Sequence, residues 1–419
     1  MNPFDQAISR TSEKKRLFPS LSDPYRGENA WSPIVSASSS LGTSLWEMEA
    51  LPARAIRELE NCIHALAERS LDPNLFFEPT FLQGALNRIT GKPPMLLCLW
   101  ETIGETRELR LFFPVSIIKL GVWRQPVLRV WSSEFSPLGT PLLDTDHHEE
   151  ALDRFIHLAS SAEIGLPGLM MLPHFPKETD SFNAWTQALT VATKPQAETG
   201  SFERAALLAM PDKSQSWINT AVGRKRRKEY ARLRRKLEQQ GELAFTSSAR
   251  PDDVRNLMES FLNLEIKSWK GRRGSALYSN KKITAFARQI VSDLANEKKC
   301  EIHAMSLDGR CIAVLISIGS QDRPLTWKTV YDEAFAQYSP GVQLMIHAST
   351  TMQERNSFVI ADSLAAPHHS MIDHLWRDRM AITNLLTALD GDPRGRFKSL
   401  CNWIARWDRA KSFVRQKLH

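Results

Sequence analysis

The chain has 419 residues, of which 42% are hydrophobic and 24% are charged. This composition is ordinary for a globular protein, and the length predicts two or three domains. The longest apolar run, residues 111–123, is too short for a membrane span and contains Pro114 and Lys119.

The formal net charge of +7 is concentrated in one segment. Residues 224–236 carry nine Lys and Arg residues and one Glu, a local charge of +8, so the remaining residues sum to about −1. A general affinity for nucleic acid does not follow from such a local charge. The five cysteines are scattered without metal-ligand spacing, which indicates reduced thiols in a cytoplasmic protein that holds no metal.

The first half of the chain predicts a short αβ unit. Residues 1–44 are polar and serine-rich, so we expect a disordered segment that is not a signal peptide. The elements expected up to residue 200 are helices at 52–69 and 80–88, strands at 95–100, 109–120 and 127–131, a helix at 149–162 and a strand at 168–172.

The second half repeats this order on a larger scale. Asp308-Gly309 predicts a tight hairpin turn between two of its strands. The expected elements are strands at 204–210, 243–246, 300–307, 311–319, 324–331 and 358–361, with helices at 213–240, 251–268, 279–296, 340–352, 371–389 and 395–418.

A turn of small residues lies between a strand and a helix in both halves, Ser136-Pro137-Leu138-Gly139 in the first and Ser339-Pro340-Gly341 in the second. We interpret this as an internal duplication. The expected fold class is α/β (α+β): two tandem units with mixed, mostly antiparallel sheets flanked by helices, and a helical C-terminal end. The expected domains are a disordered segment at 1–44, a degenerate first copy at 45–200, the second copy at 201–390 and a C-terminal helix at 391–419.

The Ser339-Pro340-Gly341 turn predicts an anion site. Ser339 is a natural N-cap, Pro340 suits the first helical position, and Gly341 allows a close approach to the backbone. A bare helix N-terminus delivered by a strand binds phosphate through its free N–H groups. The alternative is a well-capped helix start without a ligand.

Five segments of the second half follow one another in a recognisable order. They are Phe261-Leu262-Asn263-Leu264-Glu265, Trp269-Lys270-Gly271, Leu307-Asp308-Gly309-Arg310 with Ile312-Ala313, Lys328 to Ala336, and Tyr338-Ser339-Pro340-Gly341. In their order and spacing these segments resemble the GNAT acetyltransferase superfamily, in particular its cellulose-biosynthesis acetyltransferase-like branch (CelD/BcsL type). Two similar halves in tandem also resemble the Fem-type aminoacyl transferases.

The resemblance implies an acyl-CoA-dependent N- or O-acyltransferase that acts in the cytoplasm on a sugar, polysaccharide precursor or cell-envelope acceptor. It implies direct attack in a ternary complex, with the acceptor entering between the halves. Acetyl-CoA or another acyl-CoA is expected at Tyr331, Gln337, Ser339, Gly341, Val342 and Gln343. Gln337 and a single Gly341 stand where GNAT proteins usually have glutamine or arginine with spaced glycines.

Acceptor binding is expected at Trp269 and Lys270, whose ring and charge suit a sugar or an anion, and at Lys328. A lysine within a central strand points either to a cleft or to an acidic partner such as Asp362. An equal alternative for Trp269 is a buried anchor of a solvated loop.

The general base stays open among Asp362, His368, Asp373 and Glu265. Histidine beside a carboxylate suits proton transfer near neutral pH. The competing interpretation is that His368 and the nearby His369 and His374 are surface or capping residues.

The basic segment at 224–236 has three interpretations: a solvated helix face, a surface that steers an anionic donor, and a contact for transfer RNA. The last would suit an aminoacyl-tRNA-dependent transferase. A further alternative is a non-catalytic scaffold or regulator of exopolysaccharide synthesis.

Overall fold

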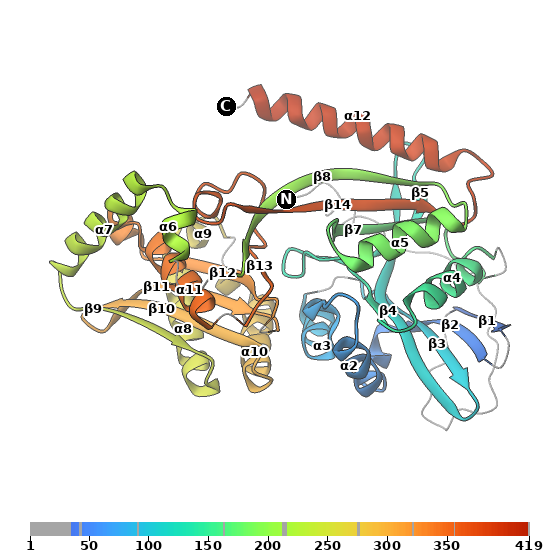
Figure 1. Ribbon diagram of the computed structural model, residues 1–419, viewed down its shortest axis with the longest axis horizontal. Helices are drawn as coiled ribbons and strands as arrows, with labels where there is room; N and C mark the ends of the chain where they lie inside the picture. The colour runs from blue at the N-terminus through green and yellow to red at the C-terminus, as the bar shows by residue number, and fades with distance from the viewer. Residues whose placement is uncertain are drawn as a thin grey trace. The chain divides into compact units, whose positions relative to one another are not determined.

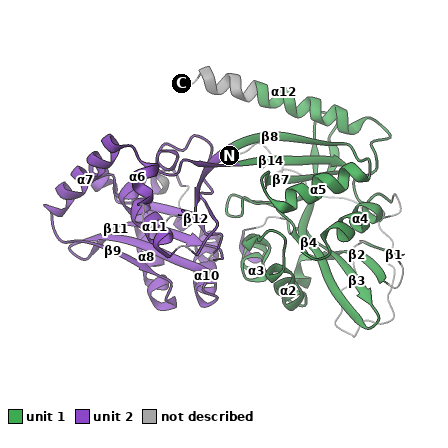
Figure 2. Cartoon of the chain, in the orientation of Figure 1, with its two compact units in different colours: residues 1–86, 91–202, 381–419 green, residues 87–90, 203–380 purple. Residues whose placement is uncertain are grey.

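The computed structural model describes residues 35–41, 44–89, 92–161, 164–211, 216–274, 277–320, 322–355 and 357–417. The chain folds into two compact units (Figure 2). Unit 1 comprises residues 1–86, 91–202 and 381–419, and unit 2 comprises residues 87–90 and 203–380. Both units combine helices with a mixed sheet, so the α/β fold class expected from the sequence is confirmed.

The sheet of unit 1 is antiparallel from β1 to β5 and parallel between β5 and β7, where Val127 lies opposite Leu169. The strand order is β1-β2-β3-β4-β5-β7-β14-β8, with β6 beside β4. The strands are β1 (Val35–Leu41), β2 (Ser44–Pro52), β3 (Met95–Ile103), β4 (Thr106–Leu120), β5 (Gln125–Val130), β6 (Leu142–Leu143), β7 (Leu169–Pro176), β8 (Gln196–Leu208) and β14 (Asp378–Ala388). The chain passes between the units within β8 and β14.

Helices cover both faces of this sheet (Figure 1). On one face, Phe113 of β4 meets Phe155 and Trp185 edge to face, with ring centroids 5.7 and 6.3 Å away. On the other face, Leu400 and Ile404 are buried against β4, β5, β7 and β14. The helices are η1 (Ala53–Ile56), α2 (Glu60–Glu68), η2 (Leu75–Phe77), α3 (Pro79–Arg88), α4 (His148–Ala159), α5 (Asp180–Val191) and α12 (Arg396–Lys417).

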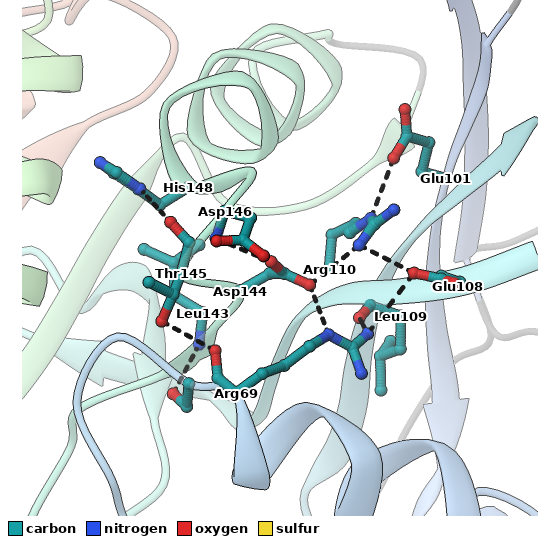
Figure 3. A network of polar contacts seen from close by, with 11 residues as sticks. Arg69, Glu101, Glu108, Leu109, Arg110, Leu143, Asp144, Thr145, Asp146 and His148 are labelled. Atoms are coloured by element: carbon teal, nitrogen blue, oxygen red, sulfur yellow. Dashed lines mark hydrogen bonds and ion pairs between the residues drawn. The ribbon is translucent and has the colours of Figure 1, made fainter.

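A buried ionic network centred on Asp144 joins the end of α2 to β3 and β4 (Figure 3). Asp144 accepts hydrogen bonds from Arg69 Nε at 2.6 Å and Arg110 Nη1 at 3.0 Å, and Arg110 Nε donates to Glu101 at 2.9 Å. Burial raises the pKa of Asp144, but the bonds from Arg69 and Arg110 outweigh it and hold the pKa below its usual value. The paired charges therefore fix three elements that are distant in sequence.

The sheet of unit 2 has the order β8-β13-β12-β11-β10-β9. Its neighbours are antiparallel except β12 and β13, which are parallel and joined by α11. The elements are α6 (Trp217–Ala221), α7 (Arg224–Glu238), β9 (Leu243–Ser248), α8 (Pro251–Lys267), α9 (Trp269–Arg272), η4 (Leu277–Ser279), α10 (Lys281–Asn296), β10 (Cys300–Leu307), β11 (Arg310–Ile318), β12 (Leu325–Tyr331), η5 (Glu333–Tyr338), α11 (Pro340–Arg355), β13 (Ile360–Asp362) and η6 (Ile372–His374).

The sequence specifies the helices of unit 2 through their caps and apolar faces. Asn280 accepts hydrogen bonds from Lys282 N and Ile283 N and so caps α10, while Pro251 opens α8. Residues of α6, α7 and α11 share one apolar cluster with Met305 and Leu315 of the sheet. Helices α8 and α10 contact the same strands. Strand side chains alternate between the two faces of a sheet, and α8 and α10 cover the face opposite to α6, α7 and α11.

Both units thus contain three antiparallel strands followed by a parallel pair with a helix between its members. In unit 1 these are β3, β4 and β5, then β7 after α4; in unit 2 they are β10, β11 and β12, then β13 after α11. Among the described residues, every helix is too short or too polar to cross a lipid bilayer.

Four expectations for local structure were wrong. Residues 35–41, expected to be disordered, pair with β2 as β1, because strand pairing uses backbone groups that serines also have. Residues 378–388, expected to be helical, form β14 beside β7. The expected helix at 213–240 is broken at Gly223 into α6 and α7, and the expected loop at 269–274 contains the short helix α9. Residues 1–34 and 42–43 of the expected disordered segment lie outside the described residues.

Three polar side chains meet on the opposite side of unit 2 from α8. Ser247 Oγ lies 2.8 Å from His303 Nδ1 and 3.1 Å from His347 Nε2, and Glu301, which is ion-paired with Arg355, lies 3.8 Å from His303 Nε2. Burial lowers the pKa of His303 to about 4. His303 is therefore neutral in the folded protein near neutral pH.

This burial predicts that unit 2 is destabilised by acid. A histidine with a lowered pKa in the folded state gives stability that is complete above its unfolded pKa of about 6.5 and is lost as the pH falls towards 4. We expect the free energy of unfolding to fall by up to about 3 kcal/mol over this range, measured by urea denaturation. His303→Gln should flatten the profile, whereas replacing the exposed His374 by Gln should leave the fall in place. An equally steep profile in His303→Gln would contradict the assignment.

Candidate active site

The parallel strands β12 and β13 separate shortly after they meet. Their ladder has one residue pair, Leu325 opposite Asp362, and β12 then continues to Tyr331. The register of β12 with β11 also slips by one residue at Trp327, which is a β-bulge. Bulges bend a strand and occur next to active sites, and a strand edge that runs past its neighbour can pair with a ligand. The last residues of β12 are therefore placed to bind an extended molecule.

The start of α11 is more tightly packed than the sequence suggested. Ser339 has a φ of 51°, in the left-handed region, and its carbonyl accepts hydrogen bonds from the amides of Val342 and Gln343, each at 3.1 Å. Gly341 is buried, and a Cβ placed on it would lie 3.2 Å from Cδ1 of Tyr331 and 3.5 Å from Sδ of Met371. Gly341 is therefore required for close packing against Tyr331, and two of the predicted phosphate-binding amides already have an acceptor.

The other predicted donor-binding residues surround this helix start. Gln343 donates through Nε2 to Tyr338 O at 2.8 Å, so its side chain secures the turn before α11. Gln337 is exposed on η5.

A cleft of about 400 Å³ lies beside the end of β12, on the side of α8. Its walls come from α8, α9, the start of β11 and the loop after β12. Three cations line it: Lys267, Arg272 and Arg310. Tyr331 lines the cleft as well, so this side chain contacts both the cleft and the start of α11.

Two acidic residues of the β12–α11 loop hold the cleft walls together. Glu333 accepts a hydrogen bond from the Trp269 amide at 2.6 Å and one from Arg272 Nη2 at 2.7 Å, which caps and anchors α9. Asp332 binds Arg310 of β11 and accepts from the Ala334 amide at 3.0 Å. The hydrogen bonds from Arg272 and Trp269 lower the pKa of Glu333. Glu333 therefore stays charged near neutral pH. Since a general base needs a pKa near the working pH, Glu333 suits the role of an anchor for α9 and not that of a base.

Three of the segments that suggested a family in the sequence meet at this cleft. Asn263 comes from the first segment, Arg310 from the hairpin segment, and Tyr331 to Ala334 from the strand segment. Of these residues, Asn263 and Ala334 are 71 positions apart in the sequence. The fold therefore explains their spacing, because each supplies one wall of the same cleft.

Asp362 is part of a buried ion pair. Arg204 Nη2 of β8 donates to Asp362 Oδ2 at 2.6 Å, and the Leu364 amide donates to Oδ1 at 2.8 Å. The sequence suggested Lys328 as a partner, whereas the salt bridge of Asp362 is with Arg204. Lys328 Nζ lies 5.8 Å from the ring centroid of Trp327.

The other residues considered as a general base do not line the cleft either. His368 is exposed, with a φ of 60°. Asp373 is four positions after His369 in the same turn region. The Nδ1 atom of His369 accepts hydrogen bonds from the Met371 and Ile372 amides. Glu265 is buried and accepts from the Leu277 amide at 2.7 Å, which ties η4 to α8. The role of each as a base stays a prediction.

The predicted acceptor-binding residues lie at the edge of this region. Trp269 is exposed at the start of α9, with Arg273 5.1 Å from its ring centroid. Lys270 belongs to the same short helix. The expected alternative of a buried Trp269 is therefore wrong.

Sequence reasoning missed several polar residues of the cleft walls, namely Asn263, Lys267, Arg310, Asp332 and Glu333. Asn263, Arg310, Asp332 and Glu333 lie within the resembling segments, so their place in those segments was the available signal.

Cys311 also lines the cleft, and burial raises the pKa of its thiol. A protonated thiol is a weak nucleophile. Among the described residues, no group of His, Cys, Asp and Glu is arranged to hold a metal ion.

The corresponding turn of unit 1 is packed without space for a ligand. A Cβ placed on Gly139 would lie 2.2 Å from the Pro173 carbonyl oxygen, and Ser136 is buried with its Oγ 2.7 Å from that of Ser133. This turn serves the packing of unit 1.

Comparisons with known proteins identify the class of unit 2. Residues 224–360 match the family model described as an acetyltransferase (GNAT) domain. The match runs from the start of α7 to the first residue of β13 and includes all residues of the cleft. Unit 2 therefore contains a region that matches a GNAT acetyltransferase domain, as the resemblance predicted, and this match supports acetyltransferase activity. No curated protein sequence matches the chain.

Several solved structures are similar to the chain at low sequence identity. FemX is 8% identical with a TM-score of 0.53, covering 84% of this chain and 99% of FemX. A tandem GNAT protein from the clavulanic acid biosynthesis pathway is 12% identical with a TM-score of 0.41, covering 82% of this chain and 98% of that protein. The DUF2156 domain of a putative lysylphosphatidylglycerol synthetase from Agrobacterium fabrum is 12% identical with a TM-score of 0.43, covering 71% and 85%. The FemX likeness shows a common fold.

Removing the Glu333 carboxylate should release α9. We expect Glu333→Ala to speed hydrogen exchange of the amides at 269–273 roughly fivefold, since a lost helix cap costs about 1 kcal/mol. The measurement is hydrogen exchange followed by mass spectrometry. Glu354→Ala, at an exposed glutamate of α11, is the matched control and should leave this segment unchanged. Unchanged exchange at 269–273 in Glu333→Ala would show that other contacts hold α9.

Proposed function

We propose that the protein transfers an acyl group from acyl-CoA to an amine or hydroxyl group of a saccharide or cell-envelope acceptor in the cytoplasm. The observation that carries the proposal is the convergence of the resembling segments on one cleft beside the end of β12. The resemblance to the CelD/BcsL type supports a polysaccharide-related acceptor. The basic and aromatic side chains around the cleft suit a polar, anionic or sugar-like group.

The donor would lie along the end of β12, with its phosphate groups at residues 337–343. The helix dipole of α11 favours negative charge there, and a backbone amide near Tyr331 would bind the thioester carbonyl. Since the Val342 and Gln343 amides already bond to Ser339 O, phosphate binding requires those bonds to be shared or exchanged. Tyr331 would shift from Gly341 as the donor enters.

The acceptor would occupy the cleft on the α8 side, with Trp269, Lys270 and Lys328 at its margin. Its nitrogen or oxygen attacks the thioester carbon, the C–N or C–O bond forms, and the C–S bond breaks. Since none of the candidate bases Asp362, His368, Asp373 and Glu265 lines the cleft, the proton lost by the acceptor would reach one of them through water and pass finally to the CoA sulfur. No covalent enzyme intermediate is needed, which agrees with a protonated Cys311.

A second candidate is an aminoacyl-tRNA-dependent transferase of Fem type. The FemX likeness in fold and the basic surface of α7 favour it. Most side chains of α7 are exposed, and Leu237 is its buried residue among those described. A complex with charged transfer RNA that weakens steeply with salt, without binding of acyl-CoA, would support this alternative. Binding of neither ligand would favour a scaffold.

Calorimetric titration of acetyl-CoA tests the donor site. The native protein should bind, and Gly341→Glu should raise Kd at least about tenfold, because the new side chain fills the space next to Tyr331 and adds a negative charge. Gly223→Glu is the matched control, since a Cβ there has open space, and it should bind like the native protein.

Thermal unfolding of each variant separates loss of binding from loss of the fold. Absence of heat with the native protein, or unchanged binding by a folded Gly341→Glu, would overturn the donor site.

A further inference from the structure

The hairpin between β4 and β5 carries two large apolar side chains in solvent. Residues 121–124 form its turn, closed by a hydrogen bond from the Arg124 amide to Gly121 O at 3.1 Å. At the tip, Val122 is 73% exposed and Trp123 is 80% exposed. Contiguous apolar side chains exposed on a surface are typical of interaction sites.

Helix α12 lies next to this hairpin. Leu400 Cδ1 would lie 3.5 Å from a Cβ placed on Gly121, and Leu400 is buried with Ile404 beneath the helix. Trp403 and Trp407 follow on α12 and stack with ring centroids 5.9 Å apart, and Trp407 is 41% exposed. The hairpin tip and α12 together therefore present aromatic side chains on one unit.

Cations surround these side chains. Lys119 and Arg124 of the hairpin are exposed, as are Arg406 and Arg409 of α12. By sequence, α12 has seven Lys and Arg residues and one Asp, a charge of +6. Subtracting these six charges and the eight of residues 224–236 from the total of +7 leaves −7 for the remainder. The positive charge of α12 is therefore a local feature of an otherwise acidic chain.

Apolar tips flanked by cations match the chemistry of an anionic lipid surface. Tryptophan favours the boundary between lipid headgroups and hydrocarbon, a valine beside it adds apolar area, and each nearby Lys or Arg is attracted by acidic headgroups. Nucleic acid fits less well, because Val122 has no ring for base stacking and Trp403 and Trp407 already stack on each other.

We propose that unit 1 binds the surface of an anionic membrane through Val122, Trp123 and Arg124 together with the exposed Arg406 and Arg409 of α12. Trp123 enters the headgroup region, and the cations of both elements hold the phosphate groups of acidic lipids. The proposal is independent of the reaction catalysed by unit 2.

Sedimentation of the full chain with vesicles tests this surface. The protein should bind vesicles of phosphatidylcholine mixed with phosphatidylglycerol, bind pure phosphatidylcholine much more weakly, and dissociate as salt is added. Trp123→Ser should weaken binding roughly tenfold, through loss of buried apolar area. Arg124→Gln should weaken it roughly fivefold.

Matched variants on unit 2 separate this surface from general stickiness. Val359 is 63% exposed and Arg250 is exposed, so Val359→Ser and Arg250→Gln should bind vesicles like the native protein. Thermal unfolding checks that each variant is folded. The proposal is overturned if the native protein binds neither vesicle, or if Trp123→Ser binds as well as native. Binding to single-stranded RNA that depends on Trp123, without vesicle binding, would assign the surface to nucleic acid instead.

Discussion

The buried ion pair between Arg204 and Asp362 fixes the strands on which the candidate active site depends. Its charged groups lie 2.6 Å apart, and both side chains are almost completely buried. Leaving one charge of such a pair without its partner costs about 3–5 kcal/mol, so β8 and β13 are held firmly together. Asp362 is also the residue of β13 that pairs with β12. The pair therefore determines where the two parallel strands meet, and β12 continues past that point towards the cleft.

The cleft then follows from contacts between segments that are distant in the chain. Glu333 anchors α9 and Asp332 anchors the start of β11, so the loop after β12 connects the two walls. Tyr331 lies between the cleft and the start of α11. A donor along β12 and an acceptor in the cleft would thus meet beside one side chain, which suits direct transfer in a ternary complex.

Local signals predicted much of the fold, but they could not predict its long-range pairing. The expected helix at 279–296 and the expected hairpin at Asp308-Gly309 were both correct, as α10 and the β10–β11 pair, because helical periodicity and tight turns depend on neighbouring residues. Residues 378–388 have apolar side chains at helical spacing, yet they pair with β7 more than 200 residues earlier in the chain. Prediction of the site is limited in the same way. The sequence indicated a turn at Ser339, but the contacts of Glu333 with Arg272 and of Asp362 with Arg204 form only after folding.

Hydrogen exchange with and without acetyl-CoA tests the central claim most directly, namely that a donor binds where β12 runs past β13. The account predicts slower exchange in residues 327–343 when acetyl-CoA is present, and no change at the packed turn of residues 136–139. Unchanged exchange in residues 327–343 at saturating acetyl-CoA, or protection confined to unit 1, would contradict it.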